Sequence, residues 1–313
     1  MSSTTGVTGA GASLRRSRPR YGERVIEALL VLAALVSVAT TFGIVVAIFV
    51  PTVAFFREPA VSLWDFLTGT TWTPLFSEAQ QEFGVLPLVA ATLTTTFIAL
   101  LVAVPLGLGA ATYLAEYASP AVRRFFKPIL EILAGIPTVV FGFFALSFVT
   151  PELTARIFEV GAFNMLTAGA VMGFAIIPIV ASLSEDAMSA VPQALRDAAY
   201  GMGSTKRQVA TRVVIPAAIS GIVAAVILAL SRAIGETMIV ALAAGQRAVF
   251  TFNPLSDGQT MTGYIAQAAS GDQPTGSIGY ESLFAVAALL FVFTLAMNIV
   301  SIRLVRRFRE EYE

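Results

Sequence analysis

Six long apolar stretches divide this chain, and they limit what it can fold into. A helix that crosses a bilayer needs about 20 predominantly apolar residues, and each stretch reaches that length. Only 13% of the 313 residues are charged and the mean hydropathy is +0.79, whereas a soluble domain carries about 25% charged residues. The sequence therefore predicts an all-α integral membrane protein with six transmembrane helices, at residues 28–56, 85–113, 128–149, 161–183, 216–245 and 282–302.

The basic residues lie almost entirely on one side of these predicted helices. Sixteen fall in the two terminal segments and in the second and fourth connections, whereas three fall in the other connections. Because Lys and Arg are enriched in cytoplasmic loops, both termini are predicted to face the cytoplasm. We expect residues 1–24 to form a disordered cytoplasmic tail, residues 25–308 the transmembrane domain and residues 309–313 a short C-terminal tail.

The composition excludes several classes of function. Twenty basic and twenty acidic residues leave no net charge, so nucleic-acid binding, which needs a basic excess to neutralise phosphates, is not expected. Histidine and cysteine are absent, so the commonest general base, metal ligand and thiol nucleophile are missing. Neither Lys127 nor Lys206 follows a glycine, so the sequence contains no phosphate-binding loop. We expect no enzymatic activity and no bound cofactor or metal.

The connection at residues 184–215 is too polar to cross a membrane, yet it carries regular helical signals. Pro192 suits the first turn of one helix, and Gly201 and Gly203 are expected to end it. Ser204 or Thr205 can cap a second helix. Two interpretations remain open for the resulting pair of short helices. It is either a docking element for a soluble partner or an amphipathic connector packed on its own bundle.

Three ionisable residues lie within the predicted membrane helices, where a charge costs roughly 2.5–3.5 kcal/mol. Arg232 and Glu236 are four residues apart, so they are predicted to share a helix face and to pair. The pair either fixes helix packing or positions the guanidinium to bind a phosphate-like oxyanion through paired hydrogen bonds. Glu131 is expected to be structural, close to Lys127 or Arg124, and is retained as a candidate residue of the substrate path.

One gapped motif in the 184–215 connection resembles a known family signature. The motif consists of Asp197-Ala198-Ala199, Gly203 and Val213-Val214-Ile215-Pro216. It resembles the E-A-A-x3-G-x9-I-x-L-P signature of ABC importer permeases, with Asp, Val and Ile replacing Glu, Ile and Leu. The resemblance implies a type I ABC importer permease fold. In that fold the motif belongs to a cytoplasmic coupling helix that sits in a groove of a separate ATPase subunit.

A second motif, SRAIGETM at residues 231–238, resembles the phosphate-specific (Pst) permeases of ABC transporters. A looser R-A-x-G-E pattern occurs in molybdate and sulfate permeases, and Thr237-Met238 favours phosphate. The segments YLAEY at 113–117 and LAGIPTVVFG at 133–142 are also similar to the phosphate family. The resemblance covers approximately residues 60–310 and is closer to the PstC-type subunit than to the PstA-type.

This resemblance implies a permease subunit of a phosphate importer in the bacterial cytoplasmic membrane, with Arg232, Glu236 and Thr237 lining the substrate path. The implied partners are a PstA-type second permease, a PstB-type ATPase dimer that uses ATP with magnesium, a PstS-type extracytoplasmic binding protein and the lipid bilayer. An importer of another oxyanion is the nearest alternative. An ATP-independent secondary transporter would need proton or sodium relay groups at mid-membrane, of which this chain offers few.

Overall fold

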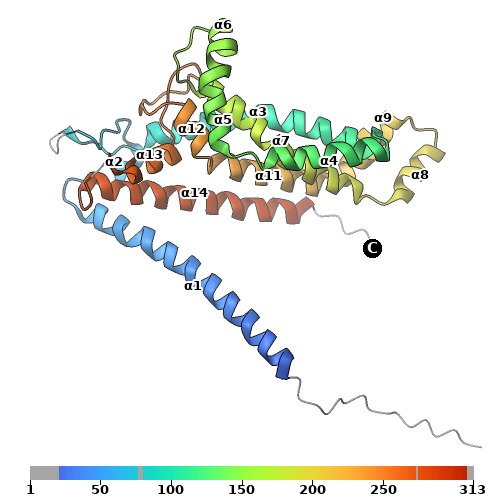
Figure 1. Cartoon of the computed structure of the whole chain (residues 1–313), viewed down its shortest axis with the longest axis horizontal. Coiled ribbons are helices and arrows are strands. Elements are labelled where there is room, and N and C mark those ends of the chain that lie inside the picture. Colours follow the sequence, from blue (N-terminus) through green and yellow to red (C-terminus); the bar gives the residue numbers. More distant parts are fainter. Residues whose placement is uncertain (1–20, 77–79, 273, 309–313) are drawn as a thin grey trace, which may run out of the picture. The chain divides into compact units, whose positions relative to one another are not determined.

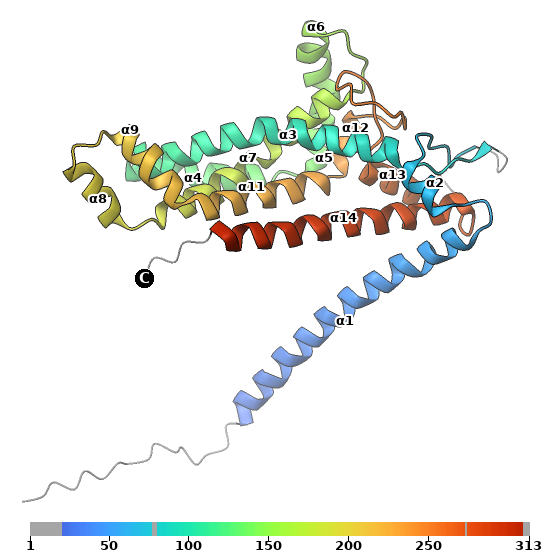
Figure 2. The ribbon, with the colours of Figure 1, turned by 180° about the vertical axis from the view of Figure 1, so that it is seen from behind.

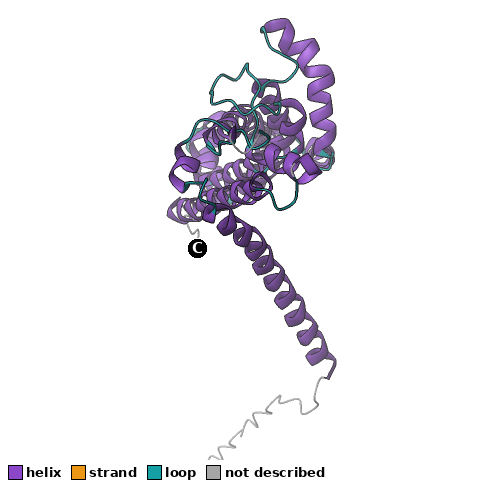
Figure 3. Cartoon of the chain, turned by 90° about the vertical axis from the view of Figure 1, so that its left-hand side faces the viewer, coloured by secondary structure: helices purple, strands orange, loops and turns teal. Residues whose placement is uncertain are grey.

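The computed structural model of the chain describes residues 21–76, 80–272 and 274–308. This part is almost entirely helical, and its extended pairings are two isolated β-bridges (Figures 1 and 3). Within it, five helices are long and apolar enough to cross a membrane, and a bent pair of helices is a sixth candidate. The predicted all-α membrane fold is confirmed. The candidates are Gly22–Arg57, Leu86–Tyr117, Thr138–Ile157, Met165–Ser189, the pair Lys206–Ala217 and Ile219–Ile234, and Ile278–Arg303.

The chain divides into two units after Ala47. In the first unit, the described residues form the N-terminal part of α1 (Tyr21–Arg57), a largely apolar helix with exposed side chains. A helix that is apolar on all sides suits a lipid environment. α1 begins inside the tail predicted for residues 1–24, and the remainder of that tail and the predicted tail at 309–313 lie outside the described residues. The features below all belong to the second unit.

Two tightly packed helices form the centre of the second unit. α3 (Leu86–Thr112) continues into the π-helical η2 (Tyr113–Tyr117) and packs along α7 (Met165–Ser189). Gly169 and Gly173 on α7 allow the close approach, because a Cβ at either position would lie 2.8 Å from a backbone oxygen of α3. Small residues with this spacing let two helix backbones approach closely.

Two further long helices complete the bundle. α11 (Ile219–Ile234) packs against α7 and α3, and α14 (Ile278–Phe308) lies along α11 (Figures 1 and 2). At one end of this bundle lie α8 (Gln193–Gly201) and α9 (Lys206–Val209), and we call this end the α8 end.

The opposite end of the bundle, called the α13 end, is built from the long connections. It contains α2 (Leu63–Thr68), α13 (Met261–Gln267) and η5 (Ala268–Asp272). Antiparallel bridges between Thr71 and Val249 and between Trp72 and Phe83 join these connections. A buried aromatic cluster packs beneath them, and it includes Phe55, Phe66, Trp72 and Tyr264.

The predicted third transmembrane segment, residues 128–149, is wrong. α4 (Pro120–Ala134) ends at Gly135, and the membrane-length segment starts only after Pro137. Proline has no N–H group and disfavours helical backbone in the preceding residue, so the helix does not continue through this point. The segment consists of α5, η3 and α6, which makes most of the predicted connection at 150–160 helical. Their bounds are Thr138–Phe144, Ala145–Thr154 and Ala155–Ile157.

The predicted fifth transmembrane segment, residues 216–245, is interrupted twice. The helix axis bends by 71° between Ala217 and Ile219, where α10 meets α11. α11 then ends at Ile234, and a break precedes α12. The mostly apolar composition of residues 216–245 therefore predicted a single helix where the backbone forms several. The short elements are η4 (Ala210–Val214), α10 (Ile215–Ala217) and α12 (Met238–Ala243).

Candidate functional site

α8 and α9 are two short helices joined by a tight turn, as the sequence predicts. Gly203 lies in this turn with φ +83°, a conformation that favours glycine. Thr205 caps α9, because its Oγ1 accepts a hydrogen bond from the Gln208 backbone N–H at 3.4 Å. The Thr205 backbone N–H donates in return to Gln208 Oε1 at 2.8 Å. This capping box fixes the direction in which α9 leaves the turn.

The α8 helix has one exposed face and one buried face. Asp197 and Ala198 are exposed, and Gln193 Nε2 donates to Asp197 Oδ1 at 3.0 Å. Ala199 is buried, and Met202 in the turn is 85% exposed. The small exposed side chains leave room for another surface to approach closely. This arrangement favours the docking interpretation over a connector that is fully packed on its own bundle.

Ile215 and Pro216, the last residues of the predicted coupling motif, lie in α10 beside the bend into α11. Ile215 is half-buried, and Pro216 is exposed. An apolar cluster beneath the motif joins it to the bundle, so α8, α9 and the start of α11 are packed on the ends of α3 and α7. Its buried members are Ala111, Met188, Val191, Ala199, Val209, Val214, Ala218 and Ile222.

Arg196 is the charged residue that fastens α8 to the bundle. Its Nε and Nη2 donate to Glu116 Oε1 at 3.1 and 2.9 Å, and both side chains are buried. Nη1 donates to the Val191 carbonyl at 2.5 Å and Nη2 to the Met188 carbonyl at 2.8 Å. Glu116 belongs to η2, and Met188 lies in the last turn of α7. One guanidinium therefore connects α8 to the ends of two membrane-length helices.

A second cluster of charges fastens α4 to α7 near the α8 end. Glu185 is buried, and it pairs with Arg123 and with Lys127, whose Nζ lies 3.0 Å from Glu185 Oε2. Lys127 Nζ also donates to Asp186 Oδ1 at 2.7 Å. The hydrogen bonds to Asp186 and then to Glu185 raise the pKa of Lys127, outweighing a desolvation that lowers it. The lysine therefore stays charged and holds α4 in place.

The role of Arg196 was not predicted from the sequence. Arg196 is one of the basic residues of the 184–215 connection, and Glu116 belongs to the YLAEY segment. One signal was present, because Arg196 is three residues before Ala199 and so shares the apolar face of α8. A charged residue on a buried helix face requires a partner. The partner lies 80 residues away in the chain, where spacing along the sequence gives no indication of it.

The predicted ion pair between Arg232 and Glu236 is not formed in the described part of the chain. Because α11 ends at Ile234, the two residues do not share a helix face. Arg232 is exposed in the last turn of α11, whereas Glu236 is buried. Glu236 Oε1 accepts from the backbone N–H groups of Met238 and Ile239 at 3.2 and 3.4 Å. Its carboxylate therefore caps α12 and leaves the guanidinium of Arg232 free to bind an anion.

Hydrogen bonds from α13 and α14 stabilise the residues at the break between α11 and α12. Thr262 Oγ1 donates to the Glu236 carbonyl at 2.6 Å, and Ser231 Oγ donates to Asn298 Oδ1 of α14 at 3.2 Å. Thr237 is half-buried at the start of α12, and its Oγ1 donates to the Gly235 carbonyl at 3.4 Å. The candidate path residues Arg232, Glu236 and Thr237 therefore lie at a discontinuity between two helices.

Glu131 lies close to Lys127 and Arg124, as predicted, but not inside a membrane-length segment. It lies in α4, outside the membrane-length segments, and it makes no ion pair with Lys127 or Arg124 among the described residues. Lys127 pairs instead with α7. Glu131 lines an open cavity of about 450 Å³ together with Arg123, Arg124 and Lys127. It is therefore placed near the α8 end and away from the break that contains Arg232.

A family model covers most of the second unit. Residues 103–310 match the family described as "Binding-protein-dependent transport system inner membrane component". The chain therefore belongs to this family of membrane permeases. The predicted coupling motif, the contacts that join it to η2 and α7, and the break before α12 all lie within the matched residues.

The chain is also similar in sequence to individual curated proteins that are ABC transporter permeases by name. The chain is 31% identical over 275 residues to the "Probable ABC transporter permease protein YqgH" of Bacillus subtilis, covering 86% of this chain and 88% of the relative. It is 32% identical to the "Phosphate transport system permease protein PstC" of Mesorhizobium japonicum, covering 74% and 75%. It is also 32% identical to "Phosphate transport system permease protein PstC 1" of Mycobacterium tuberculosis, covering 77% and 81%.

Solved structures show the same fold at low sequence identity. A bacterial alginate ABC transporter in complex with an alginate-bound periplasmic protein aligns with a TM-score of 0.63 at 17% identity, covering 92% of this chain and 98% of the other. The inward-facing methionine transporter MetNI aligns with a TM-score of 0.54 at 21% identity, covering 72% and 95%. The predicted type I ABC importer permease fold is confirmed.

Proposed function

We propose that this chain is the permease subunit of an ATP-driven importer that moves inorganic phosphate into the cytoplasm. The observation that carries the proposal is the exposed guanidinium of Arg232, which has no ion pair among the described residues and lies at the break between α11 and α12. A guanidinium matches a phosphate oxyanion through paired hydrogen bonds. The relatives named PstC support phosphate as the substrate class.

The α8 end is proposed to receive the motion of an ATPase. The exposed face of α8 docks on an ATPase subunit of the PstB type, which binds ATP with magnesium, whereas this chain binds no cofactor. When the ATPase dimer closes, α8 moves, and Arg196 transmits the displacement to η2 and α7 through its four hydrogen bonds. A PstA-type permease completes the pathway, and a PstS-type binding protein delivers phosphate at the α13 end.

The oxyanion is tested by direct uptake measurements. Cells in which this chain is the sole PstC-type permease should accumulate radiolabelled phosphate, and a tenfold excess of unlabelled sulfate or molybdate should not compete. The matched control is the same strain carrying Arg232→Gln. Uptake of molybdate or sulfate in place of phosphate would contradict the proposed substrate and assign the chain to an importer of another oxyanion.

The proposed orientation places the α8 end in the cytoplasm and both termini on the same side. Ser270 is exposed in η5 at the α13 end, and Arg207 is exposed in α9 at the α8 end. Because the chain contains no cysteine, single cysteines report on topology without background. A membrane-impermeant thiol reagent should label Ser270→Cys in intact cells. It should label Arg207→Cys only after the membrane is permeabilised, and the reverse pattern would overturn the orientation.

A further inference from the structure

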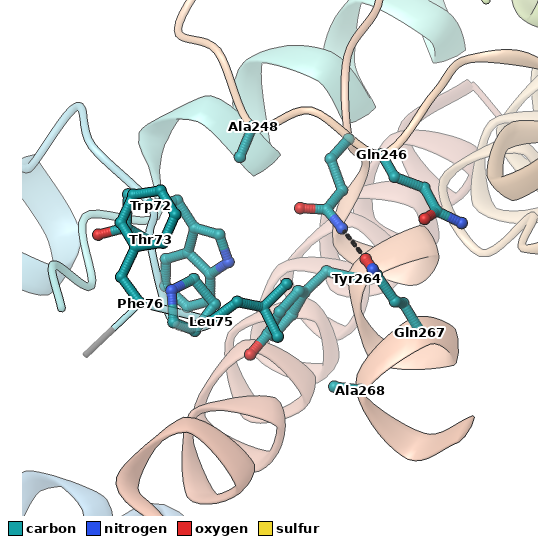
Figure 4. Close-up of a pocket in the computed structure, with 11 residues that line it drawn as sticks. Trp72, Thr73, Leu75, Phe76, Gln246, Ala248, Tyr264, Gln267 and Ala268 are labelled. Atoms are coloured by element: carbon teal, nitrogen blue, oxygen red, sulfur yellow. Dashed lines mark hydrogen bonds between the residues drawn. The ribbon is translucent and has the colours of Figure 1, made fainter. Parts of the chain in front are cut away.

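A small cavity lies at the α13 end, separate from the candidate substrate path. Its volume is about 110 Å³. Its walls come from the segment around Trp72, from the residues on either side of Arg247 and from α13 (Figure 4). None of the lining side chains is charged. The lining residues are Trp72, Thr73, Pro74, Leu75, Phe76, Gln246, Ala248, Gln259, Tyr264, Gln267 and Ala268.

The indole of Trp72 carries an unpaired hydrogen-bond donor in this cavity. Trp72 is 4% exposed, and its Nε1 is buried with no hydrogen-bond partner in the described structure. Figure 4 shows the indole nitrogen on the side of the ring that faces Gln246 and Tyr264, toward the centre of the cavity. Leaving a buried N–H unpaired is costly, so this donor is expected to be occupied by a group that the chain does not supply.

The phenol of Tyr264 and the amides of Gln259 and Gln267 already have hydrogen-bond partners. Tyr264 Oη is 2.7 Å from Ser282 Oγ, and Gln259 Nε2 donates to Gln267 Oε1 at 2.6 Å. Burial raises the pKa of Tyr264 to about 12, and the hydrogen bond to Ser282 only partly opposes this effect. The phenol therefore stays protonated at neutral pH. The indole N–H of Trp72 remains the buried donor that requires an acceptor.

The size and chemistry of the cavity define its occupant. A water molecule occupies roughly 30 Å³ of the liquid, and a dry cavity of about 150 Å³ holds benzene. The cavity is therefore sized for a group of several carbon atoms and is too small for a whole lipid. An ion such as phosphate is excluded, because no charged side chain offsets its desolvation.

We propose that this cavity binds a neutral apolar group through a carbonyl oxygen that accepts a hydrogen bond from Trp72 Nε1. Two sources share this chemistry: the ester carbonyl of a membrane lipid and a free small ketone, ester or amide. The aromatic walls formed by Trp72, Phe76 and Tyr264 contact the apolar part of the group. The site is distinct from the residues assigned to the phosphate path.

The helix α13 contacts both the cavity and the break between α11 and α12. Gln259, which lines the cavity, precedes Thr260, the cap residue of α13. Thr260 Oγ1 accepts from the Gly263 backbone N–H at 3.1 Å, and Thr262 of the same helix turn donates to the Glu236 carbonyl at 2.6 Å. An occupant of the cavity therefore contacts the helix that holds Glu236. An effect of the occupant on phosphate transport rests on the proposed function, whereas binding in the cavity does not.

Binding is tested by nuclear magnetic resonance of the Trp72 indole in the full-length chain. The chain has two tryptophans, and Trp64 is 73% exposed, so Trp64→Phe leaves one indole N–H resonance from the cavity. The protein is labelled with ¹⁵N-tryptophan and placed in nanodiscs of ether-linked lipids, which lack ester carbonyls. Titration with cyclohexanone should move the resonance downfield in a saturable manner, and methylcyclohexane, which has no acceptor, should not move it.

A second set of nanodiscs distinguishes the two sources of the carbonyl. In ester-linked lipids, a resonance already downfield before any ketone is added assigns the occupant to the lipid. A resonance that still needs cyclohexanone assigns it to a free small molecule. Neither readout depends on phosphate transport, so failure of the binding proposal is distinguishable from failure of the proposed function.

Cavity-filling variants provide the matched control. Ala248→Leu fills the cavity and should abolish the response to cyclohexanone, whereas Ala269→Leu, at an exposed position in η5, should preserve it. Two results would overturn the proposal. One is a resonance that does not respond to the ketone in either lipid and lies upfield in both. The other is a resonance already downfield in ether-linked nanodiscs without ketone, which indicates a cavity filled by water.

Discussion

Arg196→Met is expected to uncouple ATP hydrolysis from transport in the assembled importer. The substitution removes the hydrogen bonds that join α8 to η2 and α7, and it leaves Glu116 buried without its charged partner. Breaking a buried ion pair by removing one partner costs about 3–5 kcal/mol. The local strain is expected to release α8 from the bundle, so phosphate uptake per ATP hydrolysed should fall at least tenfold. The measurement is the ratio of these two rates in proteoliposomes.

Two variants separate the loss of this connection from a general loss of charge. Arg196→Met/Glu116→Gln removes both charges and should recover much of the lost stability, although coupling should remain weak because the hydrogen bonds are absent. Arg207→Met removes an exposed arginine of the neighbouring α9 and should leave the ratio unchanged. If Arg196→Met keeps the wild-type ratio of phosphate uptake to ATP hydrolysis, the hydrogen bonds from α8 to η2 and α7 are not needed for coupling.

Arg232→Gln is expected to reduce phosphate uptake by about 10- to 100-fold, because a hydrogen bond to a charged group contributes about 1.5–3 kcal/mol. Arg232 is exposed and makes no ion pair among the described residues, so its removal leaves no buried countercharge. The complex should therefore assemble normally and keep its basal ATP hydrolysis. The measurement is the initial rate of phosphate uptake against phosphate concentration, together with the yield of purified complex.

Conservative substitutions of Arg232 and Glu236 distinguish an anion-binding role from a packing role. Arg232→Lys keeps the charge but loses the paired donors of the guanidinium, so its uptake should be intermediate. Glu236→Gln keeps an oxygen that can accept from the N–H groups of Met238 and Ile239, so assembly and uptake should change little. Equal loss of complex yield in the arginine and glutamate variants would contradict this account and restore the packing role for the two residues.

The sequence could predict the parts of the fold that depend on local chemistry. The apolar stretches predicted the membrane helices, and the spacing from Pro192 to Thr205 predicted two short helices with a turn at Gly203. In each case the physical cause lies within a few neighbouring residues, through hydrophobicity, capping or the absence of a Cβ.

The features that the sequence could not predict depend on tertiary contacts or on breaks in apolar segments. The break between Ile234 and Met238 consists of Gly235, Glu236 and Thr237, which lie inside one predicted helix, and it separates Arg232 from Glu236. The connection between Arg196 and Glu116 joins residues 80 positions apart. The unpaired indole of Trp72 also depends on the surrounding cavity, because exposure and partners are set by the folded chain.

ATP-driven phosphate uptake by a reconstituted importer tests the proposed transport function. This chain, the second permease and the ATPase are placed in proteoliposomes, and radiolabelled phosphate is supplied with the binding protein. Uptake should require both ATP and the binding protein, and it should be lost in Arg196→Met. Phosphate uptake by this chain without the ATPase, driven by a proton or sodium gradient alone, would contradict it.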